Sequence, residues 1–318
     1  MLDCCVPNLS WSNLVFLLSK RLVCSLTLAF ALSFASAVNA EDPIASAIPF
    51  KYAANHILVI PAVVGGKETS FVLDTGAGVN VISETLAAKL GCTPAGTVAG
   101  KRMSGQTMTM KLVNLSALQI GSCLQRNLPI AAWKLEDVFG GAPDLTQVEG
   151  LVSLEFFRKV PFTIDYAKKL IFIETDESLK KRLSEGVSVP IQITHKRAQT
   201  SITMLLWFSN GSYARVEVDT GSGALILDER YMRELGVFKD SMDVKKVEGI
   251  DETGHSYVRY FTKLPEDVFL AQSRLFTQKK PKVQFQKIIY DGLVGDGFLS
   301  NFRVTYDLAH KRLIFARF

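Results

Sequence analysis

The feature that most constrains this chain is a short motif that occurs twice, at Phe71–Gly78 and at Val216–Gly223. In both places an apolar, strand-like run leads into Asp-Thr-Gly and then into a small residue. Average residue usage places one Asp-Thr-Gly in about one chain in twenty of this length, so a single copy would carry little information. Two copies, each at the end of a strand pattern, indicate a repeated unit.

The spacing of the two copies extends the repeat over most of the chain. Asp219 follows Asp74 by 145 positions (219 − 74), and Gly236 follows Gly91 by the same interval (236 − 91). A later segment, Gly-Leu-Val, also occurs twice, with an offset of 142 (292 − 150). We interpret this pattern as the internal duplication of one ancestral half.

The residues around each motif predict the same series of elements. A hairpin with a turn at Gly65-Gly66 or Asn210-Gly211 precedes each aspartate. A helical run follows, beginning at Ser83 or Asp228, which are both good N-caps, and ending at a glycine. A pair of alternating strands closes each half. These short, Gly-broken strand patterns predict an all-β protein of two homologous closed β-barrel lobes, with a cleft between them.

Two aspartates on matching loops suit acid–base chemistry. Like charges in close contact cannot both ionise, so Asp74 and Asp219 would share a single proton. Such a pair can deprotonate water and protonate the oxygen of a peptide carbonyl group, and it titrates as a unit. Thr75 and Thr220 can hydrogen-bond across to the opposite loop, while the glycine that follows each threonine lets the backbones approach.

Competing chemistries have no motif in the sequence. His-Glu-x-x-His, Cys-x-x-Cys, Gly-x-Ser-x-Gly and a phosphate-binding loop are all missing. The four histidines stand in different contexts without ligand spacing, so we expect no metal and no cofactor. The formal charge of +5 is scattered, which argues against a dedicated nucleic-acid surface.

Residues 1–40 have the pattern of a secretory signal peptide. Lys20-Arg21 precede an apolar run over 22–34, and small residues end at Ala40. We predict export to the periplasm or outside a bacterial cell, with an uncleaved N-terminal anchor as the alternative. After residue 40 no apolar run is long enough to span a bilayer.

The remaining 278 residues (318 − 40) are enough for two lobes, each with a buried core. We predict an N-terminal lobe over 41–175, a charged, partly helical linker over 176–189 and a C-terminal lobe over 190–318. Cys92 and Cys123 would form one disulfide in an oxidising compartment, or remain two separate buried thiols.

Two further stretches, Val98–Met110 and Val247–Tyr257, read as hairpins at matching places in the two halves. They would fold over the cleft as flaps, or they are ordinary exposed hairpins. The sequence pattern alone does not separate these alternatives.

The paired motifs, each followed by Gly-Leu-Val, resemble those of the aspartic peptidases of the retropepsin and pepsin clan. The pattern over 291–307 is most similar to bacterial retropepsin-like domains, which usually supply one aspartate per subunit and dimerise. This chain carries both halves, as pepsins do, so the resemblance implies a monomer. It implies Asp74 and Asp219 as the catalytic dyad, with a loop scaffold of Thr75, Gly76, Thr220 and Gly221, and supporting segments of Leu151 and Val152 and of Leu293, Val294 and Gly295.

The two halves differ from each other at two places. Ser153 stands where the other half has Gly295, and Ala77 stands where it has Ser222. Ser222 could hydrogen-bond its carboxylate, whereas Ala77 cannot. From Ala77 we hypothesise that the Asp74 side is less stabilised as an anion, so that activity extends toward less acidic pH.

The function that these residues predict is an aspartic-type endopeptidase, a hydrolase whose partner is a polypeptide substrate. One alternative is a non-catalytic polypeptide-binding protein on the same duplicated fold. Another is a processing peptidase with a single target, which would be inert on generic substrates.

Overall fold

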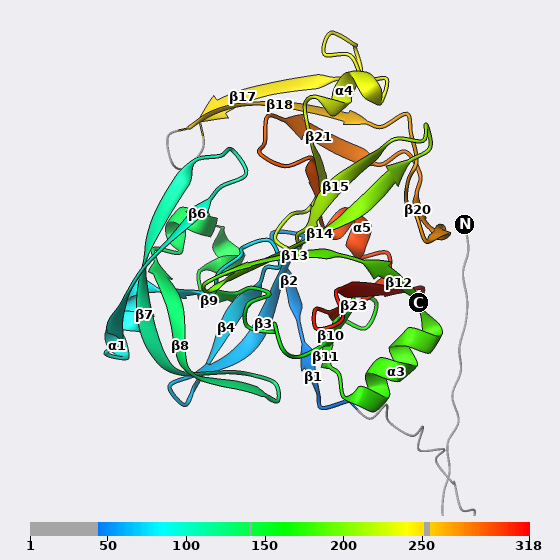
Figure 1. Ribbon diagram of the computed structural model, residues 1–318. Helices are drawn as coiled ribbons and strands as arrows, with labels where there is room; N and C mark the ends of the chain where they lie inside the picture. The colour runs from blue at the N-terminus through cyan, green and yellow to red at the C-terminus, as the bar shows by residue number, and fades with distance from the viewer. Residues whose placement is uncertain (1–43, 140–141, 251–254) are drawn as a thin grey trace, which may run out of the picture. The chain divides into compact units, whose positions relative to one another are not determined.

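The computed structural model describes residues 44–139, 142–250 and 255–318, which belong to one compact unit, Glu41–Phe318. The predicted signal peptide over 1–40 therefore lies outside the described residues, as does the tip of the second predicted flap at 251–254. Figure 1 shows the order of the elements in this unit.

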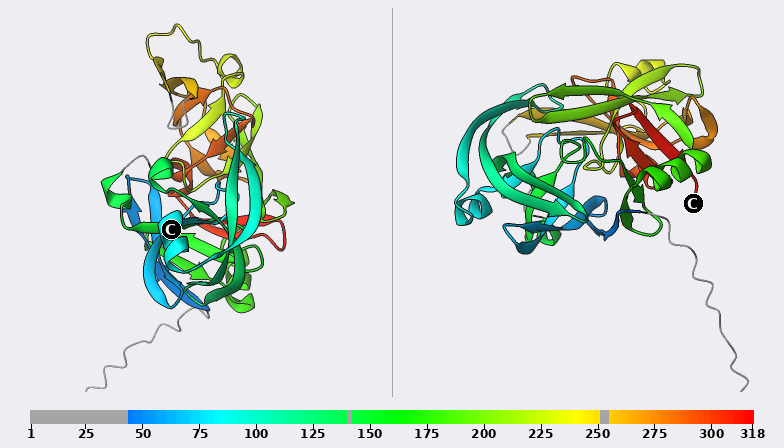
Figure 2. Two further views of the ribbon diagram at one scale, coloured as in Figure 1. Left: turned by 90° about the vertical axis from the view of Figure 1, so that its left-hand side faces the viewer. Right: turned by 60° about the horizontal axis from the view of Figure 1, so that its bottom comes forward.

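The protein is mostly β-structure, with 53% of residues in strands and 11% in helices, which confirms the all-β prediction. The described strands form three sheets. The first-half sheet contains, in spatial order, β2 (Lys51–Ala53), β3 (Ile57–Val64), β4 (Lys67–Leu73), β9 (Val148–Val152), β5 (Val81–Ser83), β8 (Cys123–Trp133), β7 (Thr107–Ile120) and β6 (Thr93–Lys101). Figure 2 shows β6 and β7 (cyan) as a long, curved hairpin at the edge of this half.

The second-half sheet repeats much of this arrangement. Its spatial order is β17 (Lys245–Ile250), β18 (Ser256–Lys263), β21 (Lys282–Gln286), β16 (Leu225–Asp228), β22 (Gly292–Val294), β15 (Tyr213–Val218), β14 (Gln199–Phe208), β19 (Val268–Leu270) and β20 (Ser273–Gln278), with β13 (Gln192–Lys196) paired to β14. In both sheets a hairpin lies beside a strand that runs parallel to it: β4 pairs with β9, and β15 pairs with β22. The two halves therefore build the surroundings of their motifs from equivalent pairings.

A third, six-stranded sheet is shared by the two halves. Its order is β1 (Ser46–Pro49), β11 (Leu170–Ile173), β10 (Phe162–Asp165), β23 (Arg303–Asp307), β24 (Arg312–Ala316) and β12 (Val187–Pro190). The halves meet where β10 pairs with β23, with Thr163 directly opposite Thr305 and their hydroxyl oxygens 2.7 Å apart. Phe162 stacks on Tyr306 there, with ring centroids 4.6 Å apart. The buried core is consequently continuous from one half into the other.

The hairpins before the two aspartates have different turns. Gly65 and Gly66 both have positive φ and connect β3 directly to β4, as predicted. Between β14 and β15, Asn210-Gly211 lies within a longer loop over 209–212. In that loop the Asn210 side chain accepts a hydrogen bond from the backbone N–H of Ser212.

The short helices that follow the motifs begin differently in the two halves. Helix α1 (Glu84–Lys89) begins at Ser83, whose hydroxyl accepts a hydrogen bond from the N–H of Leu86, as predicted. Helix α4 (Tyr231–Glu234) has Arg230 as its N-cap, so the prediction of Asp228 as an N-cap is wrong. The Asp228 carboxylate instead accepts hydrogen bonds from the backbone N–H groups of Arg230 and Ile288, because its side chain is turned toward the loop after β21.

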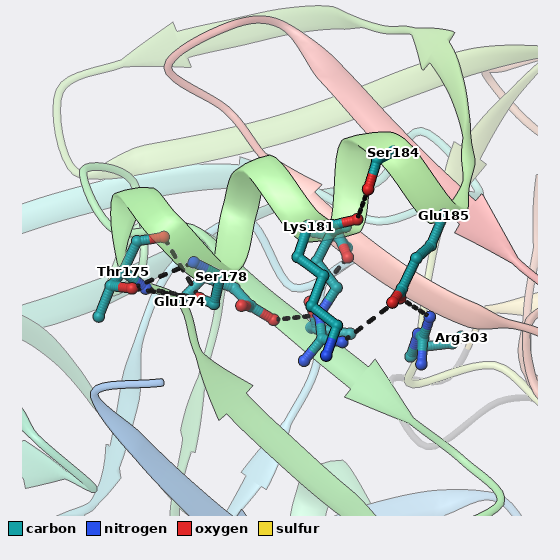
Figure 3. Close-up of polar contacts among 10 residues, drawn as sticks. Glu174, Thr175, Ser178, Lys181, Ser184, Glu185 and Arg303 are labelled. Atoms are coloured by element: carbon teal, nitrogen blue, oxygen red, sulfur yellow. Dashed lines mark hydrogen bonds and ion pairs between the residues drawn. The ribbon is translucent and has the colours of Figure 1, made fainter. Parts of the chain in front are cut away.

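The predicted linker is an ordered part of the structure. Helix α3 (Asp176–Glu185) opens with a capping box between Thr175 and Ser178, and β12 follows it into the shared sheet. Arg182 pairs with the buried carboxylate of Glu174 at 2.9 Å. Figure 3 shows the polar contacts along this helix, ending in the pair between Glu185 and Arg303. The remaining helices are α2 (Glu136–Phe139), the 3-10 helix η1 (Pro143–Leu145) and α5 (Asp296–Leu299).

Closure of the sheets into two barrels stays a prediction. In the first half, β7 also pairs with β3, through Leu118 and Gln119 opposite Val64 and Val63.

Cys92 and Cys123 are free thiols in the structure, each partly buried. Among the described residues, no helix is both long and apolar enough to cross a membrane.

Candidate active site

The two Asp-Thr-Gly loops meet at the ends of β4 and β15. The backbone of each aspartate bonds to the strand that runs parallel beside it, β9 for Asp74 and β22 for Asp219. The N–H of Asp74 donates to the carbonyl oxygen of Val152 at 2.9 Å, and the N–H of Asp219 donates to that of Val294 at 3.0 Å. The predicted supporting segments over 151–152 and 293–295 thus contact the loops directly.

Two threonines connect the loops to each other. The N–H of Thr75 donates to the hydroxyl oxygen of Thr220, and the N–H of Thr220 donates to that of Thr75, both at 3.0 Å. Each hydroxyl then donates onward, Thr75 to the carbonyl oxygen of Val218 at 2.7 Å and Thr220 to that of Leu73 at 2.9 Å. Both side chains are buried, so these four hydrogen bonds fix the distance between the loops.

The two glycines allow the close approach that the pair needs. The N–H of Gly76 donates to Asp74 Oδ1 at 2.9 Å, and the N–H of Gly221 donates to Asp219 Oδ1 at 2.8 Å. A Cβ atom on Gly76 would lie 2.4 Å from Cγ of Asp219, and one on Gly221 would lie 2.6 Å from Oδ2 of Asp74. Any side chain at either position would therefore push the carboxyl groups apart.

Each carboxyl group packs against the glycine of the opposite loop and alters the pKa of the other carboxyl group, so Asp74 and Asp219 can hold one proton between them. Burial, followed by the neighbouring Asp219, raises the pKa of Asp74 well above its usual range. Burial and then the charge of Glu217 raise the pKa of Asp219 to about 6. A form with one proton on the pair therefore exists from about pH 6 upward, until Asp74 also ionises.

Ser153 and Gly295 occupy equivalent positions beneath the two loops but make different contacts. A Cβ atom on Gly295 would lie 2.0 Å from the carbonyl oxygen of Ser222, so only glycine fits there. In the first half, the N–H and hydroxyl of Ser153 both donate to the side-chain oxygen of Asn80, at 2.9 and 3.2 Å. Asn80 is itself buried, so serine is a fully bonded part of the support under Asp74.

The hydroxyl of Ser222 does not bond to a catalytic-loop carboxylate. It lies 3.3 Å from the carbonyl oxygen of Ala224, to which it donates. In the first half, the backbone N–H of Ala77 is among the groups that lower the pKa of Asp74. The Ser222 hydroxyl therefore makes no hydrogen bond to either aspartate, and the Ala77 side chain has no polar group that could make one.

A cavity of about 880 Å³ opens above the pair. Both predicted hairpins line it, since β6 and β7 pair over 93–114 and β17 pairs with β18 over 245–261. The lining residues on the first hairpin are Lys101, Arg102, Met103, Ser104, Met108 and Met110, and those on the second are Ser256, Tyr257, Val258, Arg259 and Tyr260. This position favours flaps over ordinary exposed hairpins.

The first hairpin also contacts the second half at its tip. The N–H of Ile289 donates to the carbonyl oxygen of Met103 at 2.9 Å, and Gln286 donates to the sulfur of Met103 at 3.0 Å. The Ile289 side chain reaches to within 2.9 Å of a Cβ position on Gly105. The tip of this hairpin is thus attached across the cavity.

Sequence reasoning missed two cavity residues, Glu217 and Tyr290. Glu217 lies on β15 two residues before Asp219 and is 9% exposed. Burial, Glu217 and Asp219 together raise the pKa of Tyr290 to about 12. The alternation of β15 could have placed Glu217 on the cleft side, but a charged residue in a buried strand gave no motif.

The histidines do not gather into a site. His56 contacts the carbonyl oxygen of Ala54, His195 contacts Thr200, and His310 contacts Asp307. His255 is one of the residues that line the cavity. Over the described part of the chain, no group of three or more His, Cys, Asp or Glu side chains could hold a metal ion.

Part of the first half of the chain matches the model of a known protein family. A family model described as aspartyl protease matches residues 60–156, which include Asp74 and its supporting strand β9. This domain indicates a protease, and hence a hydrolase, as the class of activity. The second motif lies beyond the matched range. Comparison with curated proteins gave no match.

Proposed function

We propose that this protein is an aspartic endopeptidase that hydrolyses peptide bonds with water activated by Asp74 and Asp219. The observation that carries the proposal is the pair of carboxyl groups, which the crossed threonine hydrogen bonds hold close together at the floor of a cavity of about 880 Å³. A partly buried pair of acids costs stability, so its retention favours a chemical role.

The proposed reaction uses the single proton on the pair. The ionised carboxylate accepts a proton from a water molecule as the water oxygen attacks the carbonyl carbon of the peptide. The protonated carboxyl donates its proton to the carbonyl oxygen, giving a tetrahedral diol. The C–N bond then breaks while a proton passes to the leaving nitrogen. The N–H groups of Gly76 and Gly221 hold the carboxyl groups in place for these transfers.

The same proposal includes the architecture and setting of the enzyme. We propose two homologous barrel lobes that arose by duplication, with the substrate polypeptide bound between them and under the β6–β7 and β17–β18 hairpins. Both aspartates come from one chain, so a monomer suffices. The equivalent pairings around β4 and β15, and the central Thr163–Thr305 contact with its offset of 142 (305 − 163), support the duplication. Export to the periplasm or medium is proposed from residues 1–40.

The direct test compares the wild-type chain with Asp219→Asn on a peptide library between roughly pH 4 and pH 8, a range that includes the ionisation of the pair. New termini are identified by mass spectrometry, and thermal unfolding of both proteins checks that the variant is folded. We expect cleavage by the wild type and none by the variant. Equal cleavage by both would identify a contaminant. If neither protein cleaves any peptide, the proposal of a general peptidase is overturned. That result would favour a polypeptide-binding protein or a processing enzyme with one target.

A further inference from the structure

One acidic side chain in the cavity has no counterpart in the other half. Glu217 corresponds through the offset of 145 (217 − 72) to Val72, which is buried in an apolar cluster of the first half. Side chains alternate along a strand, so Glu217 lies on the same face of the chain as Asp219, two residues later. The duplicated halves therefore differ in charge immediately beside the catalytic pair.

Glu217 is buried without a partner. It is 9% exposed, and among residues 44–139, 142–250 and 255–318 no hydrogen bond or ion pair forms to its carboxyl group. It nevertheless lines both the main cavity and an adjoining cavity of about 370 Å³. An unpaired, nine-tenths buried acid that opens only into cavities is costly unless something that enters the cavity binds it.

The immediate surroundings of Glu217 favour a positive charge. Across the strand it faces Thr203 on β14 and Leu293 on β22, which carry no charge. From the catalytic loops, Asp74 and Asp219 interact with it electrostatically. Like charges in this small space repel one another and would be relieved by a cation.

The groups at the outer part of the cavities do not fill this role. Tyr290 lines both cavities beside Glu217 and is a neutral phenol. Lys101 and Lys196 are exposed, so their ammonium groups lie toward water. Arg102 contacts the sulfur of Met108 at 3.8 Å. On the second half, Lys287 and His255 are exposed, and Arg259 donates a hydrogen bond to Oε1 of Gln286 at 2.9 Å.

We infer that Glu217 is a specificity-determining residue that binds a lysine or arginine side chain of the substrate polypeptide next to the bond that is cleaved. This inference rests on the proposed peptidase function and names its substrate class. The apolar Ala77, Val79 and Leu293, which line the main cavity with Glu217, accommodate the methylene groups of such a side chain, and the carboxylate binds its cationic end.

The pH dependence of the preference follows from the ionisation of Glu217. Burial and then the charge of Asp74 raise the pKa of Glu217 to about 7. Below that pH the carboxyl group is neutral and gains little from a cation. Above it the group is ionised and forms a charge-assisted hydrogen bond. The preference for a basic side chain therefore increases as the pH rises.

The experiment measures kcat/KM on peptides that differ only at the position beside the cleaved bond, where Lys is compared with the nearly isosteric, uncharged norleucine. We expect the wild type to prefer Lys about tenfold or more at pH 7.5 and less at pH 5.5. In Glu217→Gln and Glu217→Val, which reproduces Val72, we expect a ratio near one at both pH values. The matched control is Glu229→Gln, because Glu229 lines the same cavity but already pairs with Lys239 at 3.0 Å.

The outcomes separate this inference from the proposed function. Equal Lys-to-norleucine ratios in the wild type and Glu217→Gln, with cleavage intact, would overturn the role of Glu217 and leave the peptidase standing. If the wild type does not cleave at all, a hexapeptide with a central Lys and its norleucine analogue are titrated calorimetrically against the wild type and Glu217→Gln. A Lys preference lost in Glu217→Gln would still support the site, and equal binding of the two peptides would refute it.

Discussion

Replacing Glu217 by glutamine should make the folded protein more stable, and the gain should grow with pH. The folded state raises the pKa of Glu217 to about 7 from 4.5, so the folded protein binds more protons than the unfolded chain between those values. The neutral carboxyl group is compatible with burial, and its contribution to stability is fully present below about pH 4.5. That contribution is lost as the pH rises through 7, whereas glutamine stays neutral throughout.

The size of the effect follows from the difference of about 2.5 pH units between the two pKa values. At 1.36 kcal/mol per unit, the wild type loses about 3 kcal/mol of stability relative to Glu217→Gln between pH 4.5 and a pH above 7. Asp74 and Asp219 are present in both proteins, so the part of their pH dependence that does not involve Glu217 cancels when one free energy is subtracted from the other. A change of this size is a substantial fraction of the total stability of a domain.

The assay is urea unfolding of both proteins at pH 5 and pH 8, followed by tryptophan fluorescence, with free energies extrapolated to water. We expect Glu217→Gln to have a larger free energy of unfolding than the wild type at both pH values. This difference should be about 2 to 3 kcal/mol larger at pH 8 than at pH 5. Glu68→Gln, at an exposed position on β4, controls for the removal of a negative charge. A difference between the proteins that is the same at both pH values, or that falls as the pH rises, would refute the assignment of a buried, unpaired Glu217.

Two further substitutions test the geometry of the loops. Thr220→Val keeps the shape of the side chain but removes one acceptor and one donor from the crossed hydrogen bonds, leaving two backbone groups of the opposite loop unpaired. We expect a loss of about 2 to 4 kcal/mol in urea unfolding, and a loss under 0.5 kcal/mol would contradict the described contacts. Gly221→Ala would place a methyl group 2.6 Å from Oδ2 of Asp74, so we expect kcat to fall by about a hundredfold or more with a smaller change in stability. Unchanged kcat in that variant would show that the carboxyl groups need not approach so closely.

Local and repeated features were readable from the sequence, because they depend on short-range rules. The turn at Gly65-Gly66 and the cap at Ser83 follow from backbone preferences within a few residues. The crossed bonds between Thr75 and Thr220 could be anticipated because the constant offset of 145 implies two equivalent loops. A duplication thus converts a local pattern into a prediction about contacts between distant parts of the chain.

The features that the sequence did not reveal depend on partners far away in the chain. Asp228 has the residue type and position of an N-cap, yet its carboxylate binds the N–H of Ile288, 60 residues later. Asn80 carries no motif, but it bonds to Ser153 and explains why serine replaces glycine there. Glu217 looked like any charged residue in a half-exposed strand, and only the assembled cavities show that it is buried.

The six-stranded sheet has a consequence for when the protein becomes active during its synthesis. Strand β10 can pair with β23 only after the residues of β23, which lie about 140 positions later and close to the C-terminus, have been synthesised. Until then the first half carries Asp74 without its partner, and the loops have no common base. In the proposed peptidase, an unfinished or truncated chain that ends before Asp219 therefore lacks the second carboxyl group of the pair. For the proposed peptidase, the last strands of the chain are therefore needed before the two loops can be held together.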